Sequence, residues 1–169
     1  MNGTLADEAG VLRVCLSSIR VGSKQVVDAM TKSHPDPDWP EARERRARNL
    51  RSNLKGLQEE TLSDFLAKNE QQHSVAPALT LDGQLLPVSE EDLRHIFRDN
   101  KGWDRFRALY PYSSGTVEFS RVGFNRTLTQ ALVYAGKQVD WRMGHGGYWL
   151  YARSGNRWVE SGYTEAWVS

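Results

Sequence analysis

Cysteine is almost missing from this chain of 169 residues, in which Cys15 is the only one. One thiol excludes an intrachain disulfide and any metal site that needs several thiolates. No apolar run approaches the ~20 residues that a membrane-spanning helix needs. The N-terminal stretch MNGTLADEAGVLRVCLSS lacks the basic start and apolar core of a secretory signal. We therefore expect the sequence as it stands to be cytoplasmic, or periplasmic or secreted if a leader has been cleaved from it.

An excess of either charge is also missing. Lysine and arginine total 22, aspartate and glutamate total 21, and the net charge is +1. No overall field then draws the chain to nucleic acid or to an anionic membrane. Hydrophobic residues make up 39% and charged residues 25%, as in ordinary globular proteins. The length fits one domain, and we expect a single domain over 1–169.

Helical patterns dominate residues 1–111. Apolar residues at helical spacing predict a first helix from about Asp7 to Ile19, and KQVVDAM predicts a short strand over Lys24–Met30. SHPDPDWP ends that pattern, because proline continues neither element. Further helices are expected in EARERRARNLRSNL, QEETLSDFLAKN, EEDLRHIF and WDRFRALY.

Capping and turn signals frame those helices. Asp38 fits the N-cap of the arginine-rich helix and Gly56 its end, while Ser89 and Asp92 form a capping-box-like pair. Asp82-Gly83 between short apolar runs predicts a hairpin or tight turn.

Alternating patterns dominate residues 112–169. They predict four strands: Thr116–Phe124, Thr129–Ala135, Tyr148–Arg153 and Arg157–Val168. The longest connection is the glycine-containing GKQVDWRMGHGG, and short connections favour an antiparallel arrangement. The expected fold is α+β, with N-terminal helices packed on a twisted antiparallel sheet of four to five strands. Such a sheet, curved around a helix, gives a cone-like shape similar to the nuclear-transport-factor-two-like and cystatin-like folds.

SRVGFN is the most particular stretch of the sheet half. Strand alternation places Arg121 on the same face as Val117 and Phe119. A buried arginine needs an anionic partner. The partner is either a structural carboxylate (Glu118, Glu160 or Glu165) or an anionic ligand. Gly123 indicates a bulge or close approach, and Asn125 a turn.

The connection VDWRMGHGGYW offers Asp140, Trp141, Arg142 and His145. An imidazole near a carboxylate can act as a general base. No nucleophile motif accompanies the pair, and an exposed loop histidine without a role is the simpler reading.

Aromatic residues crowd the last strands: Tyr134, Trp149, Tyr151, Trp158, Tyr163 and Trp167. They build either a sheet core or the wall of a ligand pocket. The candidate ligand-binding residues are Arg121, Tyr134, Trp141, His145, Trp149 and Tyr151.

Metal and nucleic-acid sites have weaker signals. The histidines at 34, 73, 95 and 145 show no paired-ligand spacing, and Asp36 and Asp38 beside His34 fit a proline-rich turn, so no metal or cofactor is expected. The helix spanning Arg43–Arg51 offers Arg45, Arg46 and Arg48 to phosphates, but the balanced charge argues against a nucleic-acid module.

The chain resembles a bacterial protein family that has no established function. The matching stretches are GTVEFSRVGFN, TQALVYAG, GGYWL and RWVESGYTEAWVS, with LSDFLAKN and SEEDLRHIF upstream. Relatives often bear a leader peptide and a Gly/Cys-rich stretch at the loop. In this chain the loop reads DWRMGHGG, without cysteine.

Three functions follow as hypotheses. The leading one is a non-enzymatic domain that binds a small molecule or a protein through an aromatic pocket or sheet face, with homodimer formation through exposed sheet surface. The second is a small hydrolase or isomerase, with a carboxylate or His145 as base and Arg121 stabilising negative charge. The third is nucleic-acid binding through the arginine-rich helix.

Overall fold

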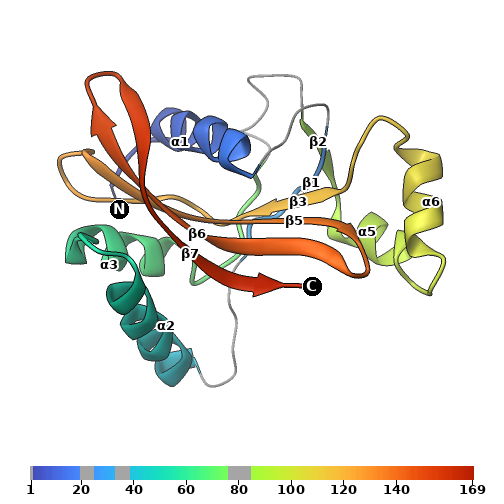
Figure 1. Cartoon of the computed structure of the whole chain (residues 1–169), viewed down its shortest axis with the longest axis horizontal. Coiled ribbons are helices and arrows are strands. Elements are labelled where there is room, and N and C mark those ends of the chain that lie inside the picture. Colours follow the sequence, from blue (N-terminus) through green and yellow to red (C-terminus); the bar gives the residue numbers. More distant parts are fainter. Residues whose placement is uncertain (1, 20–24, 33–38, 76–84) are drawn as a thin grey trace.

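The structure, a computed structural model, describes residues 2–19, 25–32, 39–75 and 85–169. It is an α+β fold in which helices lie on both faces of one open sheet (Figure 1). Within these residues the strands are β1 (Gln25–Asp28), β2 (Leu85–Val88), β3 (Thr116–Phe119), β4 (Gly123–Phe124), β5 (Gln130–Asp140), β6 (Met143–Ser154) and β7 (Arg157–Val168). The helices are α1 (Leu5–Ser18), α2 (Trp39–Asn53), α3 (Glu59–Lys68), α5 (Glu90–Ile96) and α6 (Gly102–Leu109).

The sheet is larger than the sequence predicts. Its order is β2-β1-β3-β5-β6-β7, with β4 paired to β5. The C-terminal strands are antiparallel, as expected, but β1 pairs in parallel with both β2 and β3, which makes the whole sheet mixed. Parallel neighbours need a long crossover. Helices α2 and α3 lie between β1 and β2 in the chain, and α5 and α6 lie between β2 and β3.

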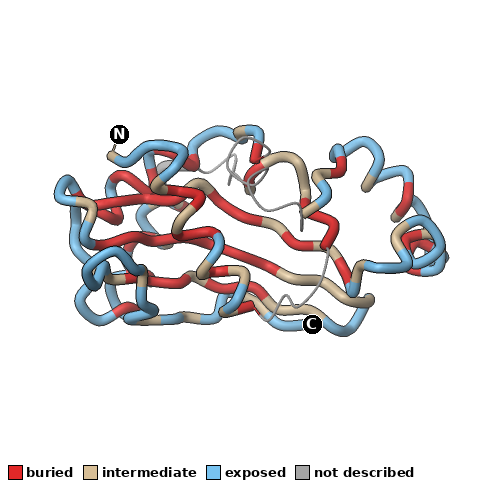
Figure 2. Tube along the Cα trace, turned by 90° about the horizontal axis from the view of Figure 1, so that it is seen from above, coloured by how far each residue is buried: buried red, intermediate tan, exposed pale blue. Residues whose placement is uncertain are grey.

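Both faces of the central strands are covered. One face packs against α1 through Val11, Leu12, Cys15, Val117, Phe119, Val133, Trp149 and Tyr151. The other packs against α2 and α3 through Leu50, Leu54, Leu62, Phe65, Leu132, Tyr134 and Leu150. The buried positions run along the middle of the sheet (Figure 2). TQALVYA is therefore apolar at successive positions because both of its faces are buried.

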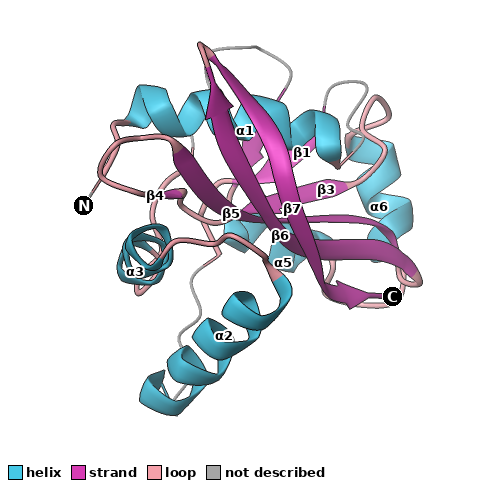
Figure 3. Ribbon diagram, turned by 60° about the vertical axis from the view of Figure 1, so that its left-hand side comes forward, coloured by secondary structure: helices cyan, strands magenta, loops and turns pink. Residues whose placement is uncertain are grey.

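A third apolar cluster lies at the other end of the molecule. Helices α5 and α6 pack there against β1 and β2, through Val26, Val88, Ile96, Trp103 and Phe106. Figure 3 shows α6 far from α3, near the turn that joins β5 to β6.

The expected strand Thr116–Phe124 is split into β3 and β4. Residues 120–122 belong to neither strand, although Ser120 still hydrogen-bonds to Tyr134 of β5, so simple alternation fails. Val122 packs in the same layer as Val117 and Phe119, although the alternating pattern places it on the opposite face.

The expected connection 136–147 is mostly strand, because β5 and β6 continue to a tight turn at Trp141 and Arg142. Its glycines predict a loop, but in the fold Gly146 and Gly147 make room for side chains of β7. A Cβ on Gly146 would collide with the Trp167 indole, and one on Gly147 would lie 2.5 Å from the Tyr163 ring. Glycine here permits close packing across strands rather than a loop.

Helix caps explain where two helices begin. Ser89 Oγ accepts from Asp92 N at 3.1 Å, which confirms the expected cap of α5. Thr4 and Asp7 form a full capping box at α1, which begins at Leu5. The expected cap Asp38 and the turn Asp82-Gly83 lie outside the described residues.

Candidate functional site

Arg121 is held by α1. Its Nε donates to the Glu8 oxygens at 2.8 and 3.1 Å, and its Nη2 donates to Glu8 Oε1 at 2.5 Å. Only 18% of the Arg121 side chain and 2% of the Glu8 side chain are exposed. The partner is therefore none of the three carboxylates expected from neighbouring strands. A charge that leaves water needs such a partner, and Glu8 accounts for the position of Arg121 without a ligand.

A second buried ion pair lies beside the first. Lys68 Nζ is 2.9 Å from Asp64 Oδ2, and 1% and 5% of these side chains are exposed. Lys68 Nζ also donates to Val122 O at 2.9 Å, and Asp64 Oδ2 accepts from Phe124 N at 2.9 Å. Helix α3 thereby fixes the backbone on both sides of Gly123.

Gly123 and Asn125 complete this attachment. A Cβ on Gly123 would lie 2.5 Å from the Phe65 backbone nitrogen, so only glycine lets α3 approach the strand. Asn125 Oδ1 accepts from Thr129 N at 2.8 Å and from Gln130 N at 3.0 Å, which closes the turn into β5. SRVGFN is thus explained by contacts within the fold.

The aromatic candidates on the sheet are separated by the sheet itself. Tyr134 lies on the face of α2 and α3, whereas Trp149 and Tyr151 lie on the face of α1. Tyr134 Oη donates to Glu118 Oε1 at 2.6 Å and accepts from Trp167 Nε1 at 2.7 Å. Burial, followed by the nearby Glu118 carboxylate, raises the pKa of Tyr134. These three residues do not share one pocket.

The tip of the β5–β6 hairpin holds Asp140 and Trp141. Asp140 Oδ1 accepts from Trp141 N at 2.6 Å, and Oδ2 pairs with Arg107 Nη2. The backbone hydrogen bond from Trp141 and then the Arg107 guanidinium lower the pKa of Asp140. His145 lies opposite Lys137 within the strands, and no hydrogen bond joins it to Asp140. The tip therefore does not hold an acid–base pair.

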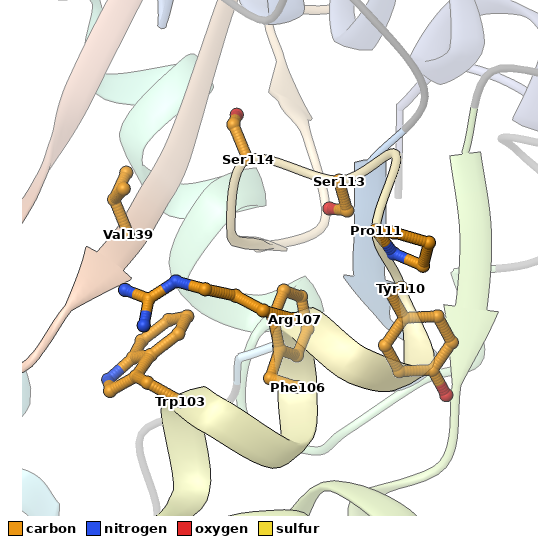
Figure 4. Close-up of a pocket in the computed structure, with 8 residues that line it drawn as sticks. All are labelled: Trp103, Phe106, Arg107, Tyr110, Pro111, Ser113, Ser114 and Val139. Carbon is orange, nitrogen blue, oxygen red and sulfur yellow. The ribbon is translucent and has the colours of Figure 1, made fainter.

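A pocket with an aromatic wall lies between α6 and the end of β5 (Figure 4). Its volume is about 290 Å³. Its lining consists of Trp103, Phe106, Arg107, Tyr110, Pro111, Ser113, Ser114 and Val139. The Arg107 guanidinium lies over the Trp103 ring, 6.0 Å from its centroid, and also pairs with Asp140. Arg107, with its carboxylate partners Asp140 and Asp104, thus forms a polar edge beside aromatic rings that pack edge-on or tilted against one another.

The serines of this pocket are engaged within the fold. Ser113 Oγ donates to Gly115 O at 2.7 Å and accepts from Val26 N at 3.1 Å. Ser114 Oγ accepts from Gln25 Nε2 at 2.9 Å. Neither is paired with a histidine or carboxylate, so the pocket lacks the base that activates a serine nucleophile.

Exposed apolar side chains occur in the segments that form or adjoin this pocket: Tyr112 contacts the ring of Tyr110, and Met143 lines a neighbouring hollow with Trp141. Leu109 is 59% exposed, Tyr112 44%, Trp141 52% and Met143 61%. We call these four residues with the pocket the α6 surface. Trp141 reaches the buried aromatic residues, with its ring 6.5 Å from that of Trp103 and 6.2 Å from that of Phe97. Of the candidate residues, only Trp141 belongs to this surface.

The sequence held a signal for the pocket that was missed. Trp103, Phe106 and Tyr110 recur at helical spacing in WDRFRALY, which places them on one face of α6. The sequence predicts a helix in this segment and a short strand at β1, but not the parallel pairing of β1 with β2 and β3 against which α6 packs.

The arginine candidates lie on α2 with different surroundings. Arg43 pairs with Glu70 at 2.8 Å and Arg51 with Glu59 at 2.7 Å. Arg45 and Arg46 line a pocket against β7, whereas Arg48 is exposed and does not line that pocket.

Among the described residues, no group of three histidine, cysteine, aspartate or glutamate side chains is arranged to hold a metal ion. His34, Asp36 and Asp38 lie outside those residues. Across the same part of the chain, no helix has the length and apolar character needed to cross a membrane. No protein-family model, curated protein or solved structure matches the chain.

Proposed function

We propose that the chain is a non-enzymatic binding domain that takes a segment of a partner protein on the α6 surface. One observation carries the proposal: Leu109, Tyr112, Trp141 and Met143 are all exposed in the segments that form or adjoin a pocket whose wall is aromatic. Exposed apolar patches with a polar rim are typical of protein interaction sites.

The size of the pocket favours one inserted side chain. Pockets that enclose drug-sized molecules measure roughly 300–1,000 Å³ and bury most of their ligand. This pocket has about 290 Å³ and is open to solvent beside the exposed residues. A partner segment would insert an aliphatic or aromatic anchor there and cover the four exposed residues with its flanks.

The polar rim fits the same role. Arg107 and Asp140 pair at the edge of the pocket, where 51% and 41% of their side chains are exposed. Rim charges change the rate and orientation of association more than its strength. We therefore assign recognition to the aromatic wall and orientation to the Arg107–Asp140 pair.

The test is a selection from a random peptide library displayed on phage, with the wild-type chain immobilised. Selected peptides are synthesised and their affinities measured by isothermal titration calorimetry. Leu109→Ala and Tyr112→Ala should weaken binding about tenfold, as expected for residues around an anchor. The matched controls are Leu5→Ala and Tyr163→Ala, because these residues are 51% and 41% exposed at other places.

Selected peptides that share an apolar anchor and lose affinity only in the α6-surface variants support the proposal. Peptides whose binding responds equally to the controls would overturn it. A metabolite that stabilises the wild-type chain, and loses its effect in Tyr110→Phe or Arg107→Gln, would identify the occupant as a small molecule instead.

A second copy of the chain is the alternative occupant of the α6 surface. Light scattering after size-exclusion chromatography measures the mass in solution. A dimer that Leu109→Ala and Trp141→Ala convert to monomer would place the self-contact at this surface.

A further inference from the structure

A second pocket of about 290 Å³ lies between α2 and β7. Helix α2 lies below the sheet in Figure 1, apart from α6 at the right. Helix α2 contributes one of its faces: Ala42, Arg45, Arg46, Asn49 and Leu50. Tyr148 of β6 and Thr164, Glu165 and Ala166 of β7 complete the lining. Polar groups dominate here, in contrast to the aromatic pocket beside α6.

The two arginines of this pocket are free of carboxylate partners among the described residues. Their neighbours Arg43 and Arg51 form ion pairs with Glu70 and Glu59, at 2.8 and 2.7 Å. No ion pair within 4.0 Å is formed by Arg45 or Arg46 in that part of the chain. Glu165 lines the same pocket but does not pair with either arginine.

The wall of the pocket is fixed in position. The Tyr148 ring contacts those of Phe65 and Tyr134, with centroids 6.0 and 5.3 Å away. Burial raises the pKa of Tyr148, and the charge and hydrogen bond of Arg46 partly offset this rise. Arg46 and Tyr148 line the same pocket, so one wall beside the Arg46 side chain is a ring held in place by its neighbours.

Neutral donors surround the arginines. Asn49 lines the pocket, and its Oδ1 accepts from Asn53 Nδ2, so its own Nδ2 is its remaining side-chain donor group. Thr164 adds a hydroxyl. Among the described lining residues, two guanidinium groups face one carboxylate, which gives this part of the pocket a net positive charge, although the chain as a whole is nearly neutral.

We infer that the α2–β7 pocket binds a phosphoryl group, with Arg45 and Arg46 pairing its charge and Asn49 and Thr164 donating hydrogen bonds. Guanidinium groups match phosphate oxygens through pairs of parallel hydrogen bonds. Several donors from two elements suit a tetrahedral anion with oxygens on every side. The volume exceeds that of one phosphate ion, so part of a carrier molecule enters with it.

The test is a nuclear magnetic resonance titration of the ¹⁵N-labelled chain with inorganic phosphate, at constant ionic strength set with sodium chloride. The wild-type chain should show saturable shifts of the Arg45 and Arg46 Nε–H signals. Arg45→Gln and Arg46→Gln should each weaken binding about tenfold, because each removes one charged donor. Arg45 is exposed, so its variant tests the site even if Arg46→Gln fails to fold.

Two further variants sharpen the result. Arg48→Gln is the matched control, because it removes the same charge from the same helix outside the pocket; its affinity should stay within about twofold. Glu165→Gln should tighten binding severalfold, because it removes the one acidic side chain among the described residues of the lining.

Phosphoserine, a nucleoside monophosphate and a short single-stranded oligonucleotide distinguish the source of the phosphoryl group. Tighter binding of either monophosphate than of inorganic phosphate, lost in Arg45→Gln, supports the site and names the carrier. Shifts that do not saturate overturn it. Oligonucleotide binding that Arg48→Gln weakens as much as Arg45→Gln also overturns it, since the whole helix face would then bind a polyanion.

Discussion

Arg121 and Glu8 form an ion pair across 113 positions of the chain, with the Arg121 Nη2 and Nε atoms 2.5 and 2.8 Å from carboxylate oxygens of Glu8. Glu8 Oε2 also accepts from Val122 N at 3.3 Å. The pair joins the first helix to the segment between β3 and β4.

Removing one partner should destabilise the fold. Arg121→Ala leaves Glu8 buried with Lys68 Nζ, 4.0 Å away, as its remaining cation, and we expect a loss of about 3 kcal/mol in the free energy of unfolding, measured in urea. Arg126→Ala is the control, because 81% of the Arg126 side chain is exposed; its change should stay within about 0.5 kcal/mol. Unchanged stability of Arg121→Ala would contradict a structural role and reopen the ligand hypothesis.

Gly123→Ala should be more harmful than its size suggests. The new Cβ would lie 2.5 Å from the Phe65 nitrogen and 2.5 Å from its Cα, so α3 must move. We expect a loss of about 1–3 kcal/mol in the free energy of unfolding. In Gly10→Ala the Cβ meets only Trp158, at 3.7 Å, and the helix gains up to about 1 kcal/mol. Equal effects of the two substitutions would contradict the close approach.

Cys15 should resist modification in the folded chain. It is fully buried, and burial raises the pKa of its thiol to about 12, while the hydrogen bond with Tyr151 acts in the opposite direction. A thiol-reactive reagent at pH 8 should therefore react only after unfolding. Rapid labelling of native protein would show that α1 opens.

The same shift makes stability depend on alkaline pH. An unfolded thiol loses its proton near 9.0, whereas the folded one keeps it up to about 12. Below the pKa of the thiol in the unfolded state, the contribution of Cys15 to the free energy of unfolding is fully present. It is lost as the pH rises toward the pKa of the thiol in the folded state. The melting temperature of the wild-type chain should fall as the pH rises between these two pKa values. The melting temperature of Cys15→Ala should fall less steeply. Parallel curves would assign the fall to Tyr134 and Tyr151, whose pKa values burial also raises.

The pKa of Asp140 reports on the hairpin tip. It lies below 3.8 because of the backbone hydrogen bond from Trp141 and the Arg107 guanidinium. In Arg107→Gln the titration midpoint, followed by nuclear magnetic resonance, should move part of the way back. High salt should have a similar effect on this exposed pair. An unchanged midpoint would mean that Trp141 alone sets the shift.

Local signals predicted local structure well. Ser89 and Asp92 predict the cap of α5, and the alternation of apolar and polar residues predicts the C-terminal strands. Each signal depends only on neighbours a few residues away. The partner of Arg121 was not predictable in this way. Glu8 lies in a distant helix, and its contact depends on how α1 crosses the sheet.

Pairing decides the rest of the site. Tyr134 and Trp149 look equivalent as aromatic strand residues, but Tyr134 pairs with Tyr148 and Val133 with Trp149, so the two candidates fall on opposite faces. Gly146 and Gly147 suggest a loop when the sequence is considered locally. Their role in close packing depends on Trp167 and Tyr163, which lie on another strand. Trp103, Phe106 and Tyr110 become a pocket wall only once β1 and β2 are in place.

The parallel pairing of β1 also affects the order in which native contacts can form during synthesis on the ribosome. Residue 28 ends β1 and residue 116 begins β3, so 88 positions separate the strand from that neighbour. At a synthesis rate of about 5–20 residues per second, several seconds pass between the synthesis of β1 and that of β3. The ion pair between Glu8 and Arg121 needs a longer interval still, because Arg121 is synthesised after β3. The first helix and strand to be synthesised are therefore among the last elements to form all of their native contacts. Until the second half of the chain has been synthesised, the nascent chain lacks the strands that bury Val11, Leu12, Val26 and Val27.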